Sequence, residues 1–460
     1  MAYAYPQHGY GLSPTSLRVA PGEAVHVAGR SGSGKSTLAR CLCGLIPHLY
    51  HGALEGKVHV DGLPTRGTPL WQLADRAGLV FQNPAAQMLT VTVEQEIIFG
   101  LENLGLSRET IDQRVEAALT RFGLEGFRGR SPHTLSGGEQ QKLALAAITA
   151  RQPPILILDE PLSMLDSTAS MQLVSHLADL TAAGTAVIAC EHRAEYLDPI
   201  PDLRTLTIEN PPARAPAQGT DPAPLQSAEP AVSPFTLQVA GLTVELGGQV
   251  VLRDLSFTAD SGQVLAVVGR NGVGKTTLLR ALAGLQGYTG DVTVNGHRPD
   301  LGIVFQNPDR QLFNATAREE VLHRLIHPDM TLYTWIMEVL GLAPYEETPP
   351  LLLSEGEKKR LALATTLMRR PCHGVMLDEP ALGQDAFHKD RLGDLTRALA
   401  ESGQLVILTT HDLALASTAD RLLILGDRGF VADGPPSELL KDPAPWSRVG
   451  LVLPNWVTSS

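Results

Sequence analysis

The chain contains Gly29-Arg30-Ser31-Gly32-Ser33-Gly34-Lys35-Ser36-Thr37, and this pattern returns as Gly269-Arg270-Asn271-Gly272-Val273-Gly274-Lys275-Thr276-Thr277. Glycines at this spacing let consecutive backbone N–H groups converge on phosphate oxygens at the positive end of a following helix. A simple glycine turn would explain one copy, but it does not explain the full pattern twice, each time after an apolar run. We therefore expect two phosphate loops, in which the lysine reaches the phosphates and the next hydroxyl contacts Mg²⁺.

Four further motifs recur in the same order along the chain. The pairs are Phe81-Gln82-Asn83-Pro84 with Phe305-Gln306-Asn307-Pro308, Leu135-Ser136-Gly137-Gly138-Glu139 with Leu353-Ser354-Glu355-Gly356-Glu357, Asp159-Glu160-Pro161 with Asp378-Glu379-Pro380, and His192 with His411. The chain is therefore a tandem duplication with roughly 200 residues per copy, a period too long for a stacked solenoid.

The region between the copies, 210–234, is rich in Pro, Ala, Gln and Ser and has no apolar period. Such a composition predicts an extended linker. We therefore expect a first domain at 1–209, a linker at 210–234 and a second domain at 235–460.

Short apolar runs indicate the fold class of each copy. Those at 24–28, 155–158 and 186–190 in the first copy correspond to 264–268, 375–377 and 405–409 in the second. Continuous apolar runs of this length, alternating with helical patterns, are typical of buried parallel strands. The sequence predicts an α/β fold with a largely parallel sheet in each copy.

The acidic pairs and the histidines complete a candidate nucleotide site in each copy. Asp159 and Asp378 are expected to hold Mg²⁺, and Glu160 and Glu379 to polarise an attacking water. His192 and His411 follow a predicted strand and could hydrogen-bond a terminal phosphate. Two solvated acids at a strand end, or an unremarkable loop histidine, would be the default for a single occurrence. Recurrence beside a phosphate loop favours the catalytic interpretation.

The Ser-x-x-Glu segments have a structural explanation that is compatible with function. Ser136 with Glu139, and Ser354 with Glu357, each precede an apolar periodic stretch and predict a capping box at a helix start. A helix start with glycines can also bind an anion. Capping alone does not explain why this element recurs shortly before each Asp-Glu strand.

Taken together, the motifs resemble those of ABC ATPases, over nearly the whole chain. The resemblance implies two P-loop ABC-type nucleotide-binding domains in tandem, each with a largely parallel core sheet and a helical subdomain. It implies ATP and Mg²⁺ as ligands, and two domains of one chain that close head to tail. Each ATP would then lie between one phosphate loop and the other copy's signature, Ser136-Gly137-Gly138 or Ser354 with Gly356.

Further residue roles also come from this resemblance. Gln82 and Gln306 match the Q-loop glutamine, which contacts Mg²⁺ beside the groove where a membrane partner docks. The expected Mg²⁺ ligands are thus Ser36, Gln82, Asp159, Thr276, Gln306 and Asp378. Asp166 and Asp385 match the D-loop, although the second departs from the usual pattern. Tyr5 matches the aromatic residue that stacks on adenine, whereas the second copy has Leu246 there, for which only an apolar contact is expected.

A narrower resemblance concerns the segments 44–48 and 56–62, with Gln87 and Gln311 after the Phe-Gln-Asn-Pro motifs. They are similar to fused ATPases of energy-coupling factor importers, which take up vitamins or transition-metal ions. This implies integral-membrane partners, namely a transmembrane coupling protein and a substrate-binding membrane component. The resemblance does not identify the transported solute.

Composition agrees with such a subunit. The 460 residues are 43% hydrophobic, yet the apolar runs are far shorter than the roughly 20 residues that span a bilayer, and 1–10 lacks the pattern of a signal peptide. We expect a cytoplasmic protein, peripheral on the membrane's cytoplasmic face. The net charge of −12 argues against nucleic acid as main partner. The rival hypothesis is a soluble twin-ABC ATPase acting on ribosomes or nucleic acid. A P-loop kinase would leave the duplicated signature unexplained.

Overall fold

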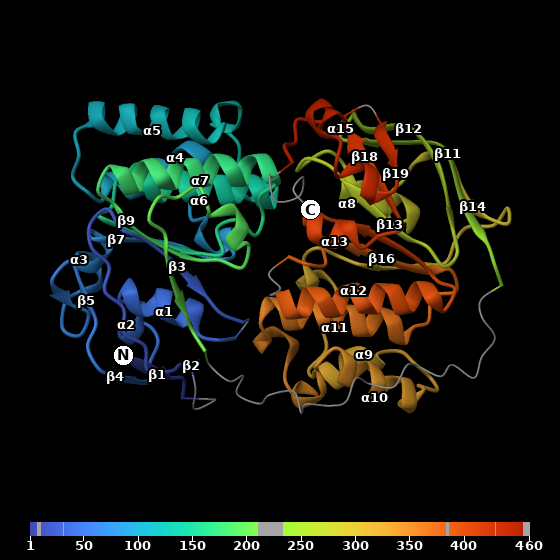
Figure 1. Cartoon of the computed structure of the whole chain (residues 1–460), viewed down its shortest axis with the longest axis horizontal. Coiled ribbons are helices and arrows are strands. Elements are labelled where there is room, and N and C mark those ends of the chain that lie inside the picture. Colours follow the sequence, from blue (N-terminus) through green and yellow to red (C-terminus); the bar gives the residue numbers. More distant parts are fainter. Residues whose placement is uncertain (7–10, 31, 210–232, 383–385, 428, 454–460) are drawn as a thin grey trace. The chain divides into compact units, whose positions relative to one another are not determined.

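The computed structural model describes residues 1–6, 11–30, 32–209, 233–382, 386–427 and 429–453 (Figure 1). The chain divides into two compact units, 1–213 and 214–460. The predicted linker at 210–234 lies outside the described residues, except for 233 and 234. Among the described residues, no helix combines the length and apolar character needed to cross a bilayer.

The first unit contains short strands and seven α-helices within its described residues. The strands are β1 (Ala2–Ala4), β2 (Gly11–Leu12), β3 (Ala24–Ala28), β4 (Ala53–Glu55), β5 (His59–Val60), β6 (Leu63–Pro64), β7 (Ala77–Val80), β8 (Ile155–Asp159), β9 (Ala186–Cys190) and β10 (Arg204–Thr207). The helices are α1 (Lys35–Leu42), α2 (Leu45–His48), α3 (Leu70–Ala74), α4 (Val93–Glu102), α5 (Arg108–Phe122), α6 (Gly137–Ala150) and α7 (Ser167–Ala182).

The second unit repeats this plan with longer strands before its phosphate loop. The strands are β11 (Thr236–Leu246), β12 (Gln249–Asp260), β13 (Val264–Val268), β14 (Thr289–Val294), β15 (Leu301–Val304), β16 (Gly374–Asp378), β17 (Leu405–Thr409), β18 (Arg421–Gly426) and β19 (Gly429–Gly434). The helices are α8 (Lys275–Leu282), α9 (Ala317–Leu322), α10 (Met330–Val339), α11 (Glu355–Met368), α12 (Ala386–Glu401), α13 (Leu413–Ser417), α14 (Pro436–Leu439) and α15 (Pro443–Arg448).

The five strands of the first core sheet correspond, read in the opposite direction, to five of the six strands of the second. In the first unit the strand order is β10-β3-β9-β8-β7, with every neighbouring pair parallel. In the second unit it is β15-β16-β17-β13-β18-β19, parallel except for the last, antiparallel pair. The predicted tandem α/β fold with largely parallel sheets is confirmed, and each unit also carries a separate three-stranded antiparallel sheet, β2-β1-β4 or β12-β11-β14.

The core explains why the strands read as unbroken apolar runs. In β13 the side chains of Val264, Ala266 and Val268 belong to a cluster with residues of α11 and α12, whereas Leu265 and Val267 pack with residues of α8 and the antiparallel sheet. Helices therefore cover both faces of the parallel sheet (Figure 1). A strand that is buried on both faces needs apolar side chains at every position.

Parallel strands align their carboxyl ends, which places the loops that follow β3, β8 and β9 at one sheet edge. These loops carry the phosphate loop, Glu160 and His192. The second unit does the same after β13, β16 and β17. Ligand sites of open α/β sheets lie at this edge, so the topology brings the predicted motifs together.

Candidate functional site

The phosphate loops join β3 to α1 and β13 to α8. Gly32 and Gly34 have φ of 76° and 103°, and Gly272 and Gly274 have φ of 80° and 109°, a region that side chains disfavour. A Cβ on Gly34 would lie 2.4 Å from the Gly11 carbonyl oxygen, whereas one on Gly32 would meet no atom within 4 Å. The loop is thus closed on one side and open on the other, as a cradle for an anion requires.

The loop lysines are almost completely buried. Lys35 and Lys275 are 4% and 7% exposed. Lys35 Nζ donates to the carbonyl oxygens of Gly29 and Arg30, at 2.7 and 3.0 Å, and Lys275 Nζ donates to those of Gly269 and Arg270, at 2.9 and 3.3 Å. Each ammonium is therefore held inside its own loop, where a phosphate would meet it.

The remaining loop residues have different environments. Ser33 and Val273 are buried beneath the loop, so they can offer only their backbone N–H groups to a ligand. Thr37 is also buried, Thr277 is half-buried, and Arg30 and Arg270 are exposed. Ser31 lies outside the described residues; Asn271 is half-buried.

The hydroxyl after each lysine contacts the first acid of the Asp-Glu pair. Ser36 Oγ donates to Asp159 Oδ1 at 3.1 Å, and Thr276 Oγ1 donates to Asp378 Oδ2 at 2.7 Å. Hydroxyl and carboxylate oxygens are the ligands that Mg²⁺ prefers. In both units the structure brings these oxygens together, and the pair fits one face of a magnesium site.

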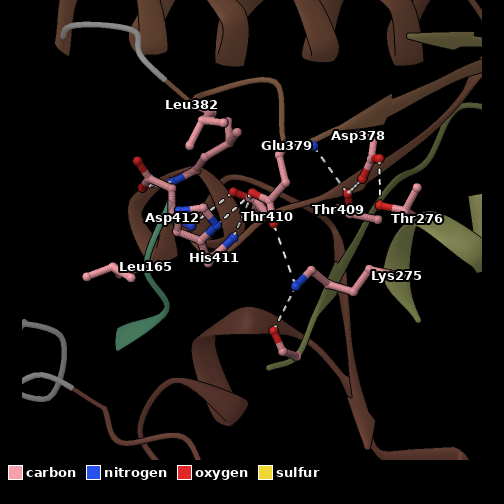
Figure 2. Close-up of polar contacts among 12 residues, drawn as sticks. Leu165, Lys275, Thr276, Asp378, Glu379, Leu382, Thr409, Thr410, His411 and Asp412 are labelled. Carbon is pink, nitrogen blue, oxygen red and sulfur yellow. Dashed lines mark hydrogen bonds and ion pairs between the residues drawn. The ribbon is translucent and has the colours of Figure 1, made fainter. Parts of the chain in front are cut away.

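The second acid of each pair lies beside the histidine (Figure 2 for the second unit). His192 Nε2 lies 3.2 Å from Glu160 Oε1, and His411 Nδ1 lies 2.9 Å from Glu379 Oε2. Glu160 and Glu379 have φ of 51° and 49°, a conformation that costs a non-glycine residue about 1–3 kcal/mol. The same strained conformation therefore recurs at the corresponding glutamate of both units, a pattern typical of functional sites.

The glutamine motifs differ between the units. Gln82 Nε2 donates to Glu160 Oε2 at 2.8 Å, so the first unit joins this glutamine to the second acid of the pair. Gln306 makes no hydrogen bond to Glu379 in the described part of the second unit. There Lys275 Nζ lies 3.6 Å from Glu379 Oε1 instead.

Neighbouring acids have opposite pKa shifts. Burial, then the charge of Glu160, raises the pKa of Asp159 to about 6. Burial acts to raise the pKa of Glu379 as well, but the charge and hydrogen bonds of His411, with Lys275, outweigh it and lower this pKa to about 2. The pKa of Glu160 is lowered for the same reasons, with His192 as the main opponent of burial. The negative charge of each pair therefore concentrates on the glutamate.

The first unit has no hydroxyl where the second unit has Thr409. Thr409 Oγ1 donates to Asp378 Oδ1 at 2.7 Å. The aligned residue beside Asp159 is Cys190, whose thiol contacts the Lys35 carbonyl oxygen at 3.7 Å. Sequence reasoning missed both residues, because they are marked only by their place two residues before the histidine. Burial also raises the pKa of Asp378, but two hydroxyl donors oppose that effect.

The signature helices begin with the predicted capping boxes. Ser136 accepts from the Glu139 N–H and the Glu139 side chain accepts from the Ser136 N–H, and Ser354 pairs with Glu357 in the same way. This prediction is confirmed. Within each unit, the described hydrogen bonds do not join the signature serine to that unit's own phosphate loop. Asp166 caps α7 through the Ala169 N–H, and Asp385 lies outside the described residues.

Tyr5 lies against the helix that follows the first phosphate loop. Its hydroxyl accepts a hydrogen bond from Arg40 at 2.9 Å and lies 3.4 Å from Thr37 Oγ1. The ring packs edge-on against Tyr3, with centroids 4.8 Å apart. Leu246, its predicted counterpart in the second unit, is 40% exposed.

Comparison with known proteins gives the family. The family model described as "ABC transporter" matches residues 12–163 and 252–382. The chain is 34% identical to "Putative ABC transporter ATP-binding protein" of Treponema denticola, over 92% of this chain and 93% of that protein. It is 31% identical to "Putative HMP/thiamine import ATP-binding protein YkoD" of Bacillus subtilis, over 92% of this chain and 88% of that protein.

A solved structure shares the fold. The chain resembles one in "Model of ribosome-bound archaeal Pelota and ABCE1", with a TM-score of 0.71 and 22% identity, over 97% of this chain and 80% of that one.

Proposed function

The chain belongs to the ABC transporter family, and we propose that it is the ATP-hydrolysing subunit that powers a membrane importer of the energy-coupling factor type, for a vitamin or a transition-metal ion. The name of the Bacillus subtilis relative, which includes HMP/thiamine import, supports this choice of solute class. The chain would lie on the cytoplasmic face of the membrane through its partners.

In this proposal each phosphate loop holds ATP through its backbone N–H groups and its lysine. Ser36 with Asp159, and Thr276 with Asp378, would hold Mg²⁺, which would neutralise phosphate charge. Glu160 and Glu379 orient the attacking water and accept its proton, while His192 and His411 contact the terminal phosphate. The proposal also includes head-to-tail pairing of the two units, in which each signature helix would complete the other unit's site.

The observation that carries the importer proposal is a short loop found in both units, which follows the Q-loop and is held by a buried carboxylate. In the first unit Glu96, 6% exposed, accepts from the N–H groups of Leu89 and Thr90 at 3.0 and 2.9 Å. In the second unit Glu320, 1% exposed, accepts from the N–H groups of Phe313 and Asn314, both at 2.7 Å.

These buried carboxylates fix a loop whose apolar side chain points into solvent. Leu89 and Phe313 are 71% and 68% exposed. Because the buried acid fixes the backbone that carries this side chain, less backbone freedom would be lost when a partner binds. We name these two segments, 88–92 and 312–316, the docking loops.

The docking loops are also fixed to the Q-loops by a matching glutamine. Gln87 accepts from the Phe81 N–H at 2.8 Å and donates to the Leu79 carbonyl at 3.0 Å. Gln311 does the same with Phe305 and Ile303, both at 2.9 Å. A membrane partner that packs on Leu89 would therefore bear on the segment that carries Gln82, which touches Glu160.

The decisive experiment is purification of the chain from membranes of its own host, followed by identification of the bound subunits. Integral-membrane proteins are expected. The variants Leu89→Asp and Phe313→Asp should lose them while the isolated chain keeps its ATPase activity. Trp71→Asp is the matched control, since Trp71 is 66% exposed on α3 and belongs to neither docking loop.

The alternative function, action on ribosomes or nucleic acid, is tested in the same preparation. The likeness to a ribosome-bound protein is a likeness of fold, and the net charge of −12 disfavours a polyanion. Co-sedimentation with ribosomes that survives high salt, without membrane subunits, would replace the importer proposal.

A further inference from the structure

The loop that follows each catalytic-site glutamate is clamped by a buried cation, and the cation differs between the units. In the second unit Lys359, 4% exposed, donates from Nζ to the carbonyl oxygens of Glu379 and Leu382, at 3.2 and 2.8 Å. It projects from α11, the signature helix, slightly more than one turn after its N-cap, Ser354.

The first unit lacks this lysine. Gln141 occupies the corresponding place in the signature helix α6, six residues after the signature leucine. Gln141 is completely buried, and neither amide atom has a hydrogen-bond partner in the described part of the chain. Leaving such a group unsatisfied costs about 1–3 kcal/mol.

Another cation clamps the loop of the first unit. Arg193, 7% exposed, donates from one guanidinium nitrogen to the carbonyl oxygens of Leu162 and Leu165, at 2.9 and 3.1 Å. Glu191 completes this clamp by accepting from the N–H groups of Leu162 and Arg193, both at 3.0 Å. In the second unit the residue at the place of Arg193 is Asp412, which pairs with Lys389 at 2.6 Å.

We propose that Lys359 is a positioning residue for Glu379, and that Arg193 has the corresponding part for the loop after Glu160. This inference rests on the proposed role of the two glutamates. Lys359 holds the carbonyl of a residue in the left-handed conformation, while the Thr409 carbonyl and hydroxyl accept from the Glu379 N–H, at 3.0 and 3.2 Å. Both the N–H and the carbonyl of Glu379 are thereby fixed.

The consequence is that the two glutamates are linked differently to the signature helix of their own unit. In the second unit a shift of α11 acts directly on the backbone of Glu379. In the first unit the clamp comes from the segment after β9, so α6 can shift without pulling on Glu160 through this side chain. The second site should therefore be the one whose turnover depends on the signature-helix side chain.

The test is the ATPase activity of the isolated chain, with one site silenced at a time. In a Glu160→Gln background only Glu379 remains, and Lys359→Gln should lower kcat roughly tenfold with the KM for ATP unchanged within twofold. Lys359→Arg, which keeps N–H donors, should restore part of the loss. In a Glu379→Gln background Lys359→Gln should leave kcat within twofold.

The mirror variants keep the inference falsifiable if Lys359→Gln does not fold. Arg193→Met should lower turnover only where Glu160 is active, and adding Gln141→Lys should restore part of it by building the second unit's clamp into the first. Equal losses in both backgrounds, or a raised KM with unchanged kcat, would overturn the positioning role. If silencing both glutamates leaves turnover intact, the assignment of the bases fails instead.

Discussion

Asp159→Asn should stabilise the first unit at neutral pH, although Asp159 belongs to the proposed ATP site. The carboxyl is 6% exposed, and in the folded protein its pKa is raised from 3.8 to about 6. At about 1.36 kcal/mol for each pKa unit, that difference corresponds to about 3 kcal/mol. A raised pKa means that the folded state favours the protonated acid. The contribution of this group to the free energy of unfolding is therefore fully present below about pH 4 and is lost as the pH rises to about 6.

The asparagine variant avoids this loss because it carries no charge and keeps an oxygen that can accept from Ser36. It should exceed the parent protein by up to about 3 kcal/mol at pH 7.5 and by nothing near pH 4. For a unit of this size that gain raises the melting temperature by roughly 6–12 °C. The assay is thermal unfolding from pH 4.5 to 8, with EDTA and without nucleotide.

Asp378→Asn is the matched control. Asp378 accepts from the Thr276 and Thr409 hydroxyls, which oppose the effect of burial, so its replacement should give a smaller gain. Adding Mg²⁺ and ATP should reverse the order for Asp159→Asn, because a ligand that binds only the folded parent stabilises it. A lower melting temperature at pH 7.5, or a gain independent of pH, would refute the reasoning.

Three further predictions concern the ATP sites. Lys35→Ala and Lys275→Ala should each weaken ATP binding at one site by roughly ten- to a hundredfold, as expected when a charged hydrogen bond of about 1.5–3 kcal/mol is lost. The double variant should not hydrolyse ATP, and full ATPase activity in that variant would rule out the phosphate-loop assignment. Glu379→Gln should lower ATP turnover more than Glu160→Gln, because the first unit's site would use the signature in which Glu355 replaces a glycine. Glu355→Gly should reduce the difference in turnover between these two variants. A larger loss in Glu160→Gln would reject the first unit's site as the slower one. Mass measurement of the Glu160→Gln, Glu379→Gln double variant with ATP should give one chain per particle, and obligate two-chain assemblies would contradict pairing within the chain.

Much of the fold could be predicted because its determinants are local. The runs at 24–28 and 264–268 became β3 and β13 with the same bounds, since a strand buried on both faces must be apolar throughout. The capping boxes depend on a serine and a glutamate three residues apart, and both formed. The meeting of Ser36 with Asp159 followed from a parallel sheet, which gathers the ends of its strands at one edge.

The contacts that distinguish the two sites could not be predicted in this way. Thr409 reaches Asp378 because β16 and β17 pair with those two residues in register, and register is a property of the folded sheet. Lys359 reaches Glu379 because of the rotation of α11 over the sheet, which its own periodicity does not fix. For Lys359 the signal in the sequence was a difference between the copies, a lysine in one signature helix and a glutamine in the other.

These differences surround the motif residues and leave the motifs themselves nearly identical. Two identical chains would have to use one set of neighbours for both glutamates, whereas a duplicated chain can hold each glutamate with its own partners. Cys190 and Thr409 alter the surroundings of the proposed Mg²⁺ ligand, and Arg193 and Lys359 alter the support of the loop after the proposed base. Both changes lie one contact away from the proposed reacting groups, where they would adjust the rate of one site without removing its chemistry. We infer that any inequality between the two sites arises from these neighbours as well as from Glu355, so variants that exchange them between the units should move the two turnover rates toward each other.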